Sequence, residues 1–249
     1  MNTINELFSL SSKVALVTGV ARGNGRAIAE GLLAAGASVV GLDIMPYEGE
    51  YDIDFHLCDI TNTGEMEKIF TNVVNKYEKI DILVNNAGVS YSQDFLEYSS
   101  QTWDYTHDVN LKAPFELMLL VGRNMKENDS GGSIINITSL NSEMAFPNNP
   151  AYISSKGALK QLTKSAALDL GKYNIRVNNV GPGYMKTEMT RNSWSNSTIH
   201  DERKNKTILQ RWGQPSDLVG ITIFLASNAS AYITGQDIYV DGGWLIKGL

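Results

Sequence analysis

Val14-Ala15-Leu16-Val17 leads directly into Thr18-Gly19-Val20-Ala21-Arg22-Gly23-Asn24-Gly25. The apolar run predicts a short buried strand, and Ile28, Leu32 and Ala35 then recur at helical spacing before Gly36. A glycine-rich turn between a strand and a helix lets backbone N–H groups and the helix dipole meet a pyrophosphate. Taken alone, the same glycines also fit an ordinary turn, so the rest of the chain decides between the two interpretations.

Outward from this turn, strand patterns alternate with helix patterns, and no linker or repeat interrupts them. Short apolar runs predict strands at 38–42, 55–57, 80–84, 133–137, 175–180 and 237–240. Longer periodic stretches predict helices at 66–77, about 103–125, 151–171 and 217–226. This alternation predicts an α/β fold: a single-domain, Rossmann-type, doubly wound parallel sheet over residues 1–249, with helices on both faces.

Composition excludes several classes of protein. Hydrophobic residues make up 43% of the 249 residues, which is enough for a sizeable core. The formal charge of −6 disfavours a nucleic-acid or anionic-membrane surface. Cys58 is the only cysteine, which suits a reducing compartment, and residues 1–12 lack a signal-peptide pattern. We therefore expect a cytoplasmic protein with a small-molecule substrate, no membrane span and no nucleic-acid partner.

A carboxylate at the end of the second predicted strand supports the nucleotide interpretation. Asp43 can accept hydrogen bonds from adenosine ribose hydroxyls, and it would repel a 2′-phosphate. Arg22 in the glycine turn is a counter-signal, because a basic residue there could pair with that phosphate. Asp43 lies where the ribose is expected, so the pattern favours NAD over NADP.

A second group of residues indicates hydride chemistry. Tyr152 and Lys156 lie one turn apart on a predicted helix, and Ser139 follows a predicted strand. A secondary alcohol that gives up a hydride must also lose its hydroxyl proton, so a base is needed near the oxygen. A free phenol titrates near 10, and the charge of Lys156 should favour the phenolate of Tyr152. Ser139 can hydrogen-bond the substrate oxygen at the edge of the sheet where ligands bind.

In this order the motifs resemble those of the short-chain dehydrogenase/reductase family over nearly the whole chain. The spacing TGxxxGxG at 18–25 and the segment Asn85-Asn86-Ala87-Gly88 match that family. Asn24 departs from it, since most members carry Ile or Leu there. The resemblance implies a catalytic tetrad of Asn110, Ser139, Tyr152 and Lys156.

The resemblance also implies roles toward the cofactor. Asn110 would hold a water that connects Lys156 to solvent, and Lys156 would also bind the nicotinamide ribose. The cofactor-binding residues expected from the turn and the matched motifs are Gly19, Arg22, Gly23, Asn24, Gly25, Asp43, Asp59, Ile60, Asn86, Ala87, Gly88, Tyr152, Lys156, Pro182, Gly183 and Thr187.

The predicted substrate pocket is polar. Its expected residues flank the tetrad: Asn141, Glu143, Asn149 and Tyr184. The polar stretch 190–211 is expected to be a lid, and Arg191 or Arg211 in it could meet a carboxylate. The three histidines share no metal-ligand spacing, so no metal site is expected.

The C-terminal segments 211–218 and 240–245 resemble the gluconate and deoxygluconate dehydrogenase branch of the family, whose members suggest a homotetramer. The expected function is NAD-dependent oxidation of a secondary hydroxyl on a sugar, sugar acid or other polyol. Two alternatives stay open. One is an NADPH-dependent reductase of 3-oxoacyl thioesters or other carbonyl compounds, and the other is a catalytically silent NAD(H)-binding regulatory or scaffold protein.

Overall fold

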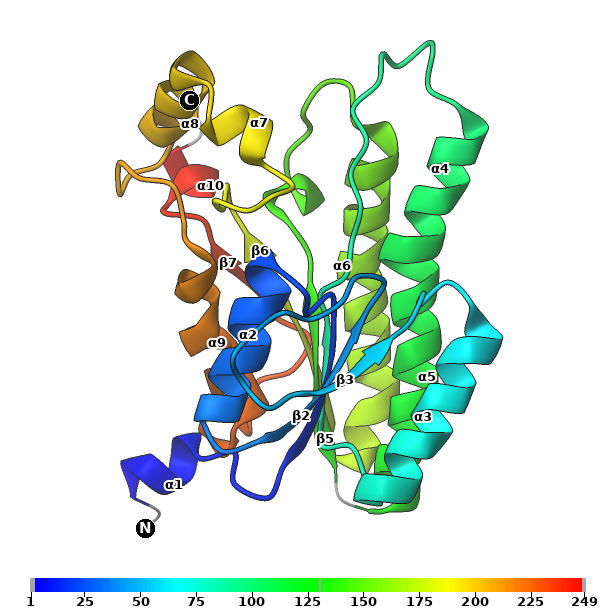
Figure 1. Cartoon of the computed structure of the whole chain (residues 1–249). Helices are drawn as coiled ribbons and strands as arrows, with labels where there is room; N and C mark the ends of the chain where they lie inside the picture. The colour runs from blue at the N-terminus through cyan, green and yellow to red at the C-terminus, as the bar shows by residue number, and fades with distance from the viewer. Residues whose placement is uncertain (1–2, 130, 248–249) are drawn as a thin grey trace.

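The computed structural model describes residues 3–129 and 131–247. Seven parallel strands form one sheet in the order β3-β2-β1-β4-β5-β6-β7 (Figure 1). The strands are β1 Val14–Thr18, β2 Ser38–Asp43, β3 Asp54–Leu57, β4 Ile82–Asn85, β5 Gly132–Ile137, β6 Ile175–Pro182 and β7 Asp237–Val240. The predicted doubly wound parallel sheet is therefore confirmed. The strand order reverses between β1 and β4, where ligands bind in open sheets of this kind.

Helices cover both faces of the sheet (Figure 1). The helical segments are α1 Ile4–Phe8, α2 Gly23–Ala34, α3 Thr63–Tyr77, α4 Ser100–His107, η1 Asp108–Lys112, α5 Ala113–Glu127, η2 Leu140–Ser142, α6 Pro150–Leu170, η3 Gly171–Tyr173, α7 Arg191–Trp194, α8 Ser197–Lys206, η4 Pro215–Leu218, α9 Val219–Ala226, η5 Asn228–Ser230 and α10 Trp244–Lys247. None of these helices, within the described residues, is long and apolar enough to cross a membrane.

Alternation along β1 explains why its sequence is apolar throughout. Val14 and Leu16 pack into the core on the side of α3, α5 and α6. Ala15 and Val17 pack into the other core, which α2 and α9 cover. A central strand of a doubly wound sheet buries both of its faces, so it reads as a continuous hydrophobic run.

The helix predicted at about 103–125 is interrupted. α4 ends at His107, a π-helical turn covers η1, and α5 continues to Glu127. Pro114 lies in the first turn of α5 and has no N–H to give to the carbonyl of Asn110. The lost hydrogen bond accounts for the wider turn, and wide turns of this type often mark functional positions.

Polar side chains form a ladder across four strands on the α6 face of the sheet. Asn85, Asn136, Asn179 and Asp237 are successive register partners on β4, β5, β6 and β7. Asn85 donates to Asn136 at 2.8 Å, and Asn179 donates to Asp237 at 2.7 Å. Thr163 of α6 connects these two pairs. Its hydroxyl accepts from Asn136 at 2.7 Å and donates to Asn179 at 2.6 Å. This ladder fixes α6 on the sheet at one register.

Replacing Asn136 should cost stability, because its fully buried amide satisfies both Asn85 and Thr163. We expect Asn136→Ala to lower the free energy of unfolding by about 2–4 kcal/mol, from unpaired buried groups and a small cavity. Urea unfolding measures the change. Asn72→Ala, on the exposed side of α3, is the control and should stay within about 0.5 kcal/mol. Equal stability of the two variants would contradict a structural role for the ladder.

Candidate active site

The glycine turn lies at the carboxyl end of β1 and opens α2. Gly19 and Gly23 adopt left-handed conformations, with φ of 75° and 59°. Arg22 is the N-cap residue of α2, but its side chain makes no capping hydrogen bond. The first N–H groups of α2 therefore have no side-chain acceptor and face a long pocket, where an anion would satisfy them.

Asn86 and Thr18 hold this turn in place from the neighbouring strand. The Thr18 hydroxyl accepts from the backbone N–H groups of Asn86 and Ala87, both at 3.0 Å. The Asn86 amide donates to the carbonyls of Thr18 and Gly19 at 2.9 and 3.2 Å. A Cβ on Gly25 would lie 1.9 Å from the Gly19 carbonyl oxygen, so only glycine allows this closure. Asn86 lines the pocket and also supports the turn.

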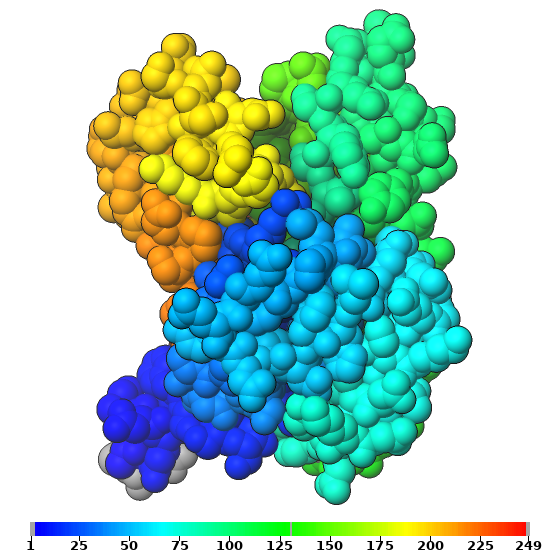
Figure 2. All heavy atoms as spheres, viewed as in Figure 1, coloured from blue at the N-terminus to red at the C-terminus, as the bar shows by residue number. Residues whose placement is uncertain are grey.

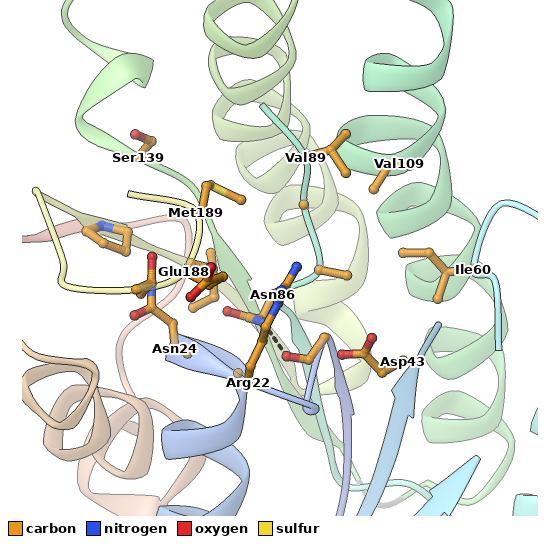
Figure 3. Close-up of a pocket in the computed structure, with 18 of the residues that line it drawn as sticks. Arg22, Asn24, Asp43, Ile60, Asn86, Val89, Val109, Ser139, Glu188 and Met189 are labelled. Carbon is orange, nitrogen blue, oxygen red and sulfur yellow. Dashed lines mark hydrogen bonds between the residues drawn. The ribbon is translucent and has the colours of Figure 1, made fainter. Parts of the chain in front are cut away.

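Asp43 ends β2 beside the turn, and its carboxylate is oriented by backbone groups. It accepts from the N–H of Ala21 at 2.9 Å and from the N–H of Met45 at 3.0 Å. Each oxygen keeps a further lone pair, so the carboxylate can still accept from ribose hydroxyls. Figure 3 shows Asn24 and Glu188 on one side of the pocket and Asp43 and Ile60 on the other.

The pocket wall also contains residues that were not predicted. Ile44 and Met45, directly after Asp43, line the pocket beside the carboxylate, and their place in the sequence could have indicated this. Cys58 lines it too, and burial raises the pKa of its thiol to about 11. Cys58 is thus neutral near pH 7 and contributes packing rather than nucleophilic chemistry.

Ser139, Tyr152 and Lys156 meet at the same end of the pocket. Ser139 follows β5, while Tyr152 and Lys156 project from the first turns of α6. The Lys156 ammonium is buried, donates to the carbonyl of Ile137 at 2.8 Å and lies 5.8 Å from the centre of the Tyr152 ring. The arrangement places a phenol, a hydroxyl and a cation around one point of the pocket.

The pKa values of this group are shifted by burial. Burial lowers the pKa of Lys156 to about 8. Burial also raises the pKa of the Tyr152 phenol, and the Ser139 hydroxyl beside it opposes part of that rise. The expected downward shift of the Tyr152 pKa by Lys156 is therefore not seen. Loss of solvation in the pocket outweighs the hydrogen bond from Ser139.

Asn110 lies in the π-helical turn η1 and is fully buried. Its amide oxygen accepts from the N–H of Val89 at 2.9 Å, and its amide nitrogen donates to the Val89 carbonyl at 2.9 Å. A second donation reaches the Ser155 hydroxyl at 3.2 Å. Asn110 thus connects the segment after Gly88 to α6, next to Lys156, and does not itself line the pocket.

The pocket brings together most of the residues that the sequence singled out. Those in its wall are Gly19, Arg22, Gly23, Asn24, Gly25, Asp43, Asp59, Ile60, Asn86, Ala87, Gly88, Ser139, Tyr152, Lys156, Pro182, Gly183 and Thr187. The Asn24 amide oxygen is buried there without a hydrogen-bond partner. An acceptor of this kind, with the open helix start and Asp43, suits a dinucleotide with anionic and hydroxyl groups.

The four expected substrate residues lie outside that wall. Asn141 accepts from the Ser139 hydroxyl at 3.1 Å and so touches a residue of the pocket wall. Glu143 pairs with Lys160 and accepts from the Tyr239 hydroxyl at 2.6 Å. Asn149 donates to the Ser90 hydroxyl at 2.7 Å. Tyr184 packs among aromatic side chains.

The stretch 190–211 contains α7 and α8, and both arginines expected to meet a carboxylate have partners inside the chain. Arg191 pairs with Glu188 at 3.1 Å. Arg211 binds Asp217 through both terminal nitrogens, at 2.6 and 2.9 Å. Neither guanidinium is left for a substrate in this structure.

Fold and site together define a Rossmann-type oxidoreductase that binds a nicotinamide dinucleotide. A family model described as "Enoyl-(Acyl carrier protein) reductase" matches residues 19–245. The chain belongs to the short-chain dehydrogenase/reductase family, as its motifs led us to expect.

Individual relatives are similar over nearly the full length. The 2-dehydro-3-deoxy-D-gluconate 5-dehydrogenase of Dickeya dadantii is 36% identical, covering 96% of this chain and 98% of that protein. A gluconate 5-dehydrogenase from Burkholderia cenocepacia, solved with NADP and tartrate, has a TM-score of 0.92 and 33% identity over 97% of this chain and 98% of that one. A 4-hydroxyisoleucine dehydrogenase complexed with NADH has a TM-score of 0.89 and 34% identity over 93% and 98%.

Lys156 should give the protein a characteristic dependence of stability on pH. In the unfolded chain a lysine keeps its proton up to about pH 10.4, whereas folded Lys156 releases it near 8. Between these values the unfolded state holds more protons at Lys156, so the contribution of Lys156 to stability rises with pH, by about 3 kcal/mol over the window. In urea unfolding from pH 7 to 10, the free energy of unfolding of the wild type should rise relative to that of Lys156→Met. Parallel pH curves for the two proteins would contradict the low pKa.

Proposed function

We propose that this protein oxidises a secondary hydroxyl on a sugar acid or related polyol, with NAD as the hydride acceptor. The observation that carries the proposal is the meeting of Ser139, Tyr152 and Lys156 at one end of a pocket that fits a dinucleotide. The bound nicotinamide supplies the hydride acceptor, and the chain supplies the base and the orientation.

In this proposal the Tyr152 phenolate takes the hydroxyl proton and becomes the phenol, while the carbon loses its hydride to the nicotinamide. Ser139 holds the substrate oxygen against the phenol, and Asn141 orients the Ser139 hydroxyl through their hydrogen bond. Lys156 places a positive charge near the Tyr152 ring, which favours the phenolate that accepts the substrate proton. Asn110 holds the segment after Gly88 against α6 and so keeps Lys156 in position.

Several features support a preference for NAD. Asp43 lies free to accept at the end of β2, and apolar Ile44 and Met45 follow it in the pocket wall. A 2′-phosphate there would be repelled, and Arg22 opposes that repulsion. Relatives have been solved with NADP and with NADH, so the choice rests on these residues.

The substrate class is supported by the relatives, whose names include gluconate and deoxygluconate dehydrogenases. A second candidate is an NADPH-dependent reductase of 3-oxoacyl thioesters or other carbonyl compounds, and the description of the family model also names a reductase of an acyl-carrier substrate. The negative net charge disfavours docking of an acidic carrier protein. A catalytically silent binding protein is disfavoured because both Tyr152 and Lys156 are present. A substrate panel should therefore contain sugar acids, polyols and a 3-oxoacyl thioester.

We extend the proposal to a cytoplasmic homotetramer. Large apolar side chains are exposed along α4 and α5: Trp103, Tyr105, Phe115 and Leu119. A face of this kind on a globular protein suits burial against another subunit, as expected from the family resemblance.

Cofactor choice can be tested at Asp43. We expect Asp43→Asn to weaken NADH and strengthen NADPH binding, shifting their ratio by about 10–100-fold, because charge-assisted bonds to the ribose are lost and repulsion is removed. Fluorescence titration with both cofactors measures the ratio. Glu48→Gln removes the same charge from the following loop and should change the ratio far less. A wild type that prefers NADPH would mean that Arg22 outweighs Asp43.

The proposed base can be tested at Tyr152. Tyr152→Phe should lower kcat by about 10²–10⁴-fold, because no group then accepts the hydroxyl proton. NADH binding should remain nearly unchanged, since the aromatic ring is kept. Tyr173→Phe, beyond the far end of α6, is the control with normal turnover. Wild-type kcat in the Tyr152→Phe enzyme would refute the mechanism.

A further inference from the structure

Arg203 of α8 is a cation without a counter-ion. Its guanidinium carbon lies 3.8 Å from the centre of the Tyr184 ring, and its Nε is buried without a hydrogen-bond partner. Among the described residues, no carboxylate forms an ion pair with it. Burial lowers the pKa of Arg203, and no neighbouring anion opposes that shift. An arginine nevertheless stays protonated in proteins, so the site holds an uncompensated positive charge.

Three other cations of the same segment are paired. Arg191 pairs with Glu188, Lys206 with Glu202 at 3.1 Å, and Arg211 with Asp217. The segment therefore does not lack carboxylates, yet none of them reaches Arg203. A buried donor left without an acceptor costs free energy, and such a group is usually satisfied by something outside the chain.

Aromatic rings surround Arg203 and hold its guanidinium in place. Trp244 stacks on Tyr184 with ring centres 4.6 Å apart. Because Arg203 and Trp244 both lie near contact distance of the ring, they occupy its opposite faces. Phe146 and Trp212 meet Tyr184 edge-on, at 5.9 and 5.5 Å. The rings stabilise the positive charge but accept no strong hydrogen bond, so the N–H groups remain available.

The cluster lies beside the proposed reaction centre. Tyr184 follows Pro182 and Gly183, which line the cofactor pocket, and Met185 after it lines the pocket as well. β5 and β6 pair in register, with Ile137 opposite Val180. Continuing this register sets Ser139 beside Pro182, where β6 ends, and Tyr184 follows two residues later along the chain. Figure 2 shows α7 and α8, in yellow, facing the segment after β4 across a hollow at this end of the molecule.

We propose that Arg203 binds the carboxylate of the substrate, at a distance of several carbon atoms from the hydroxyl that is oxidised. This inference rests on the proposed function and specifies its substrate class. A planar guanidinium gives two parallel hydrogen bonds to a carboxylate, and its hold on Tyr184 fixes its direction. Tyr184 and Arg203 lie outside the pocket wall that contains Ser139, so an anion on Arg203 would sit apart from the oxidised hydroxyl. This suits a sugar acid better than a 2-hydroxy acid, whose two groups are adjacent.

The test compares Arg203→Gln, Arg203→Lys and the wild type on D-gluconate, sorbitol and sorbitol 6-phosphate. We expect Arg203→Gln to raise KM for gluconate by about 10–100-fold and to leave KM for sorbitol and kcat for both nearly unchanged. Arg203→Lys should recover part of the loss. Lys204→Gln removes the same charge from the same helix and should behave like the wild type. Melting temperatures check that each variant is folded.

Other outcomes would overturn the inference. An equal rise in KM for gluconate and sorbitol would make Arg203 a structural residue. Dependence on Arg203 for sorbitol 6-phosphate alone would replace the carboxylate by a phosphate. If the wild type oxidises none of the three, the proposed function fails. Calorimetric titration of gluconate into the enzyme–NADH complex then tests separately whether Arg203 binds the carboxylate. Binding that Arg203→Gln abolishes would support it, and binding that is absent or unchanged would not.

Discussion

Parallel pairing of β1, β2, β4, β5 and β6 is the constraint on which the site depends. In a parallel sheet every strand ends on the same edge, so residues that follow different strands meet there. Gly19 follows β1, Asp43 ends β2, Asn86 follows β4, Ser139 follows β5 and Gly183 follows β6. The crossover helices keep these ends close while the chain between them runs across the sheet and back.

α6 carries Tyr152 and Lys156 to this edge, and its contacts with the sheet set its position. Thr163, near the middle of the helix, is inserted between Asn136 and Asn179 of the buried ladder. Polar contacts of this kind have one satisfied geometry, unlike apolar packing, which tolerates small shifts. The helix can therefore neither slide nor rotate without leaving buried amides unpaired. The positions of Tyr152 and Lys156 are therefore a consequence of the contacts that hold α6.

Lys156 and Arg203 are two cations without a carboxylate partner in the described part of the chain, and they differ in what they could do. Lys156 donates to a backbone carbonyl and is near the point of losing its proton, which suits a group that takes part in proton movement. Arg203 keeps its charge and has aromatic faces around it, which suits recognition of an anion. The pKa of Lys156 depends on how deeply its ammonium is buried. The position of the Arg203 guanidinium depends on a segment far along the chain folding over Tyr184.

The sequence by itself determined the parallel α/β sheet with its seven strands, the main helices between them, the nucleotide turn and the Ser-Tyr-Lys group. These follow from local periodicity and from motifs whose residues act close to a strand end. Tertiary structure alone decided that Pro114 opens a π turn at Asn110, that Glu143 pairs with Lys160, and that Arg203 is left unpaired. It also decided the direction of the Tyr152 pKa shift. Burial and partner choice depend on atoms brought together from distant segments, and no local pattern records them.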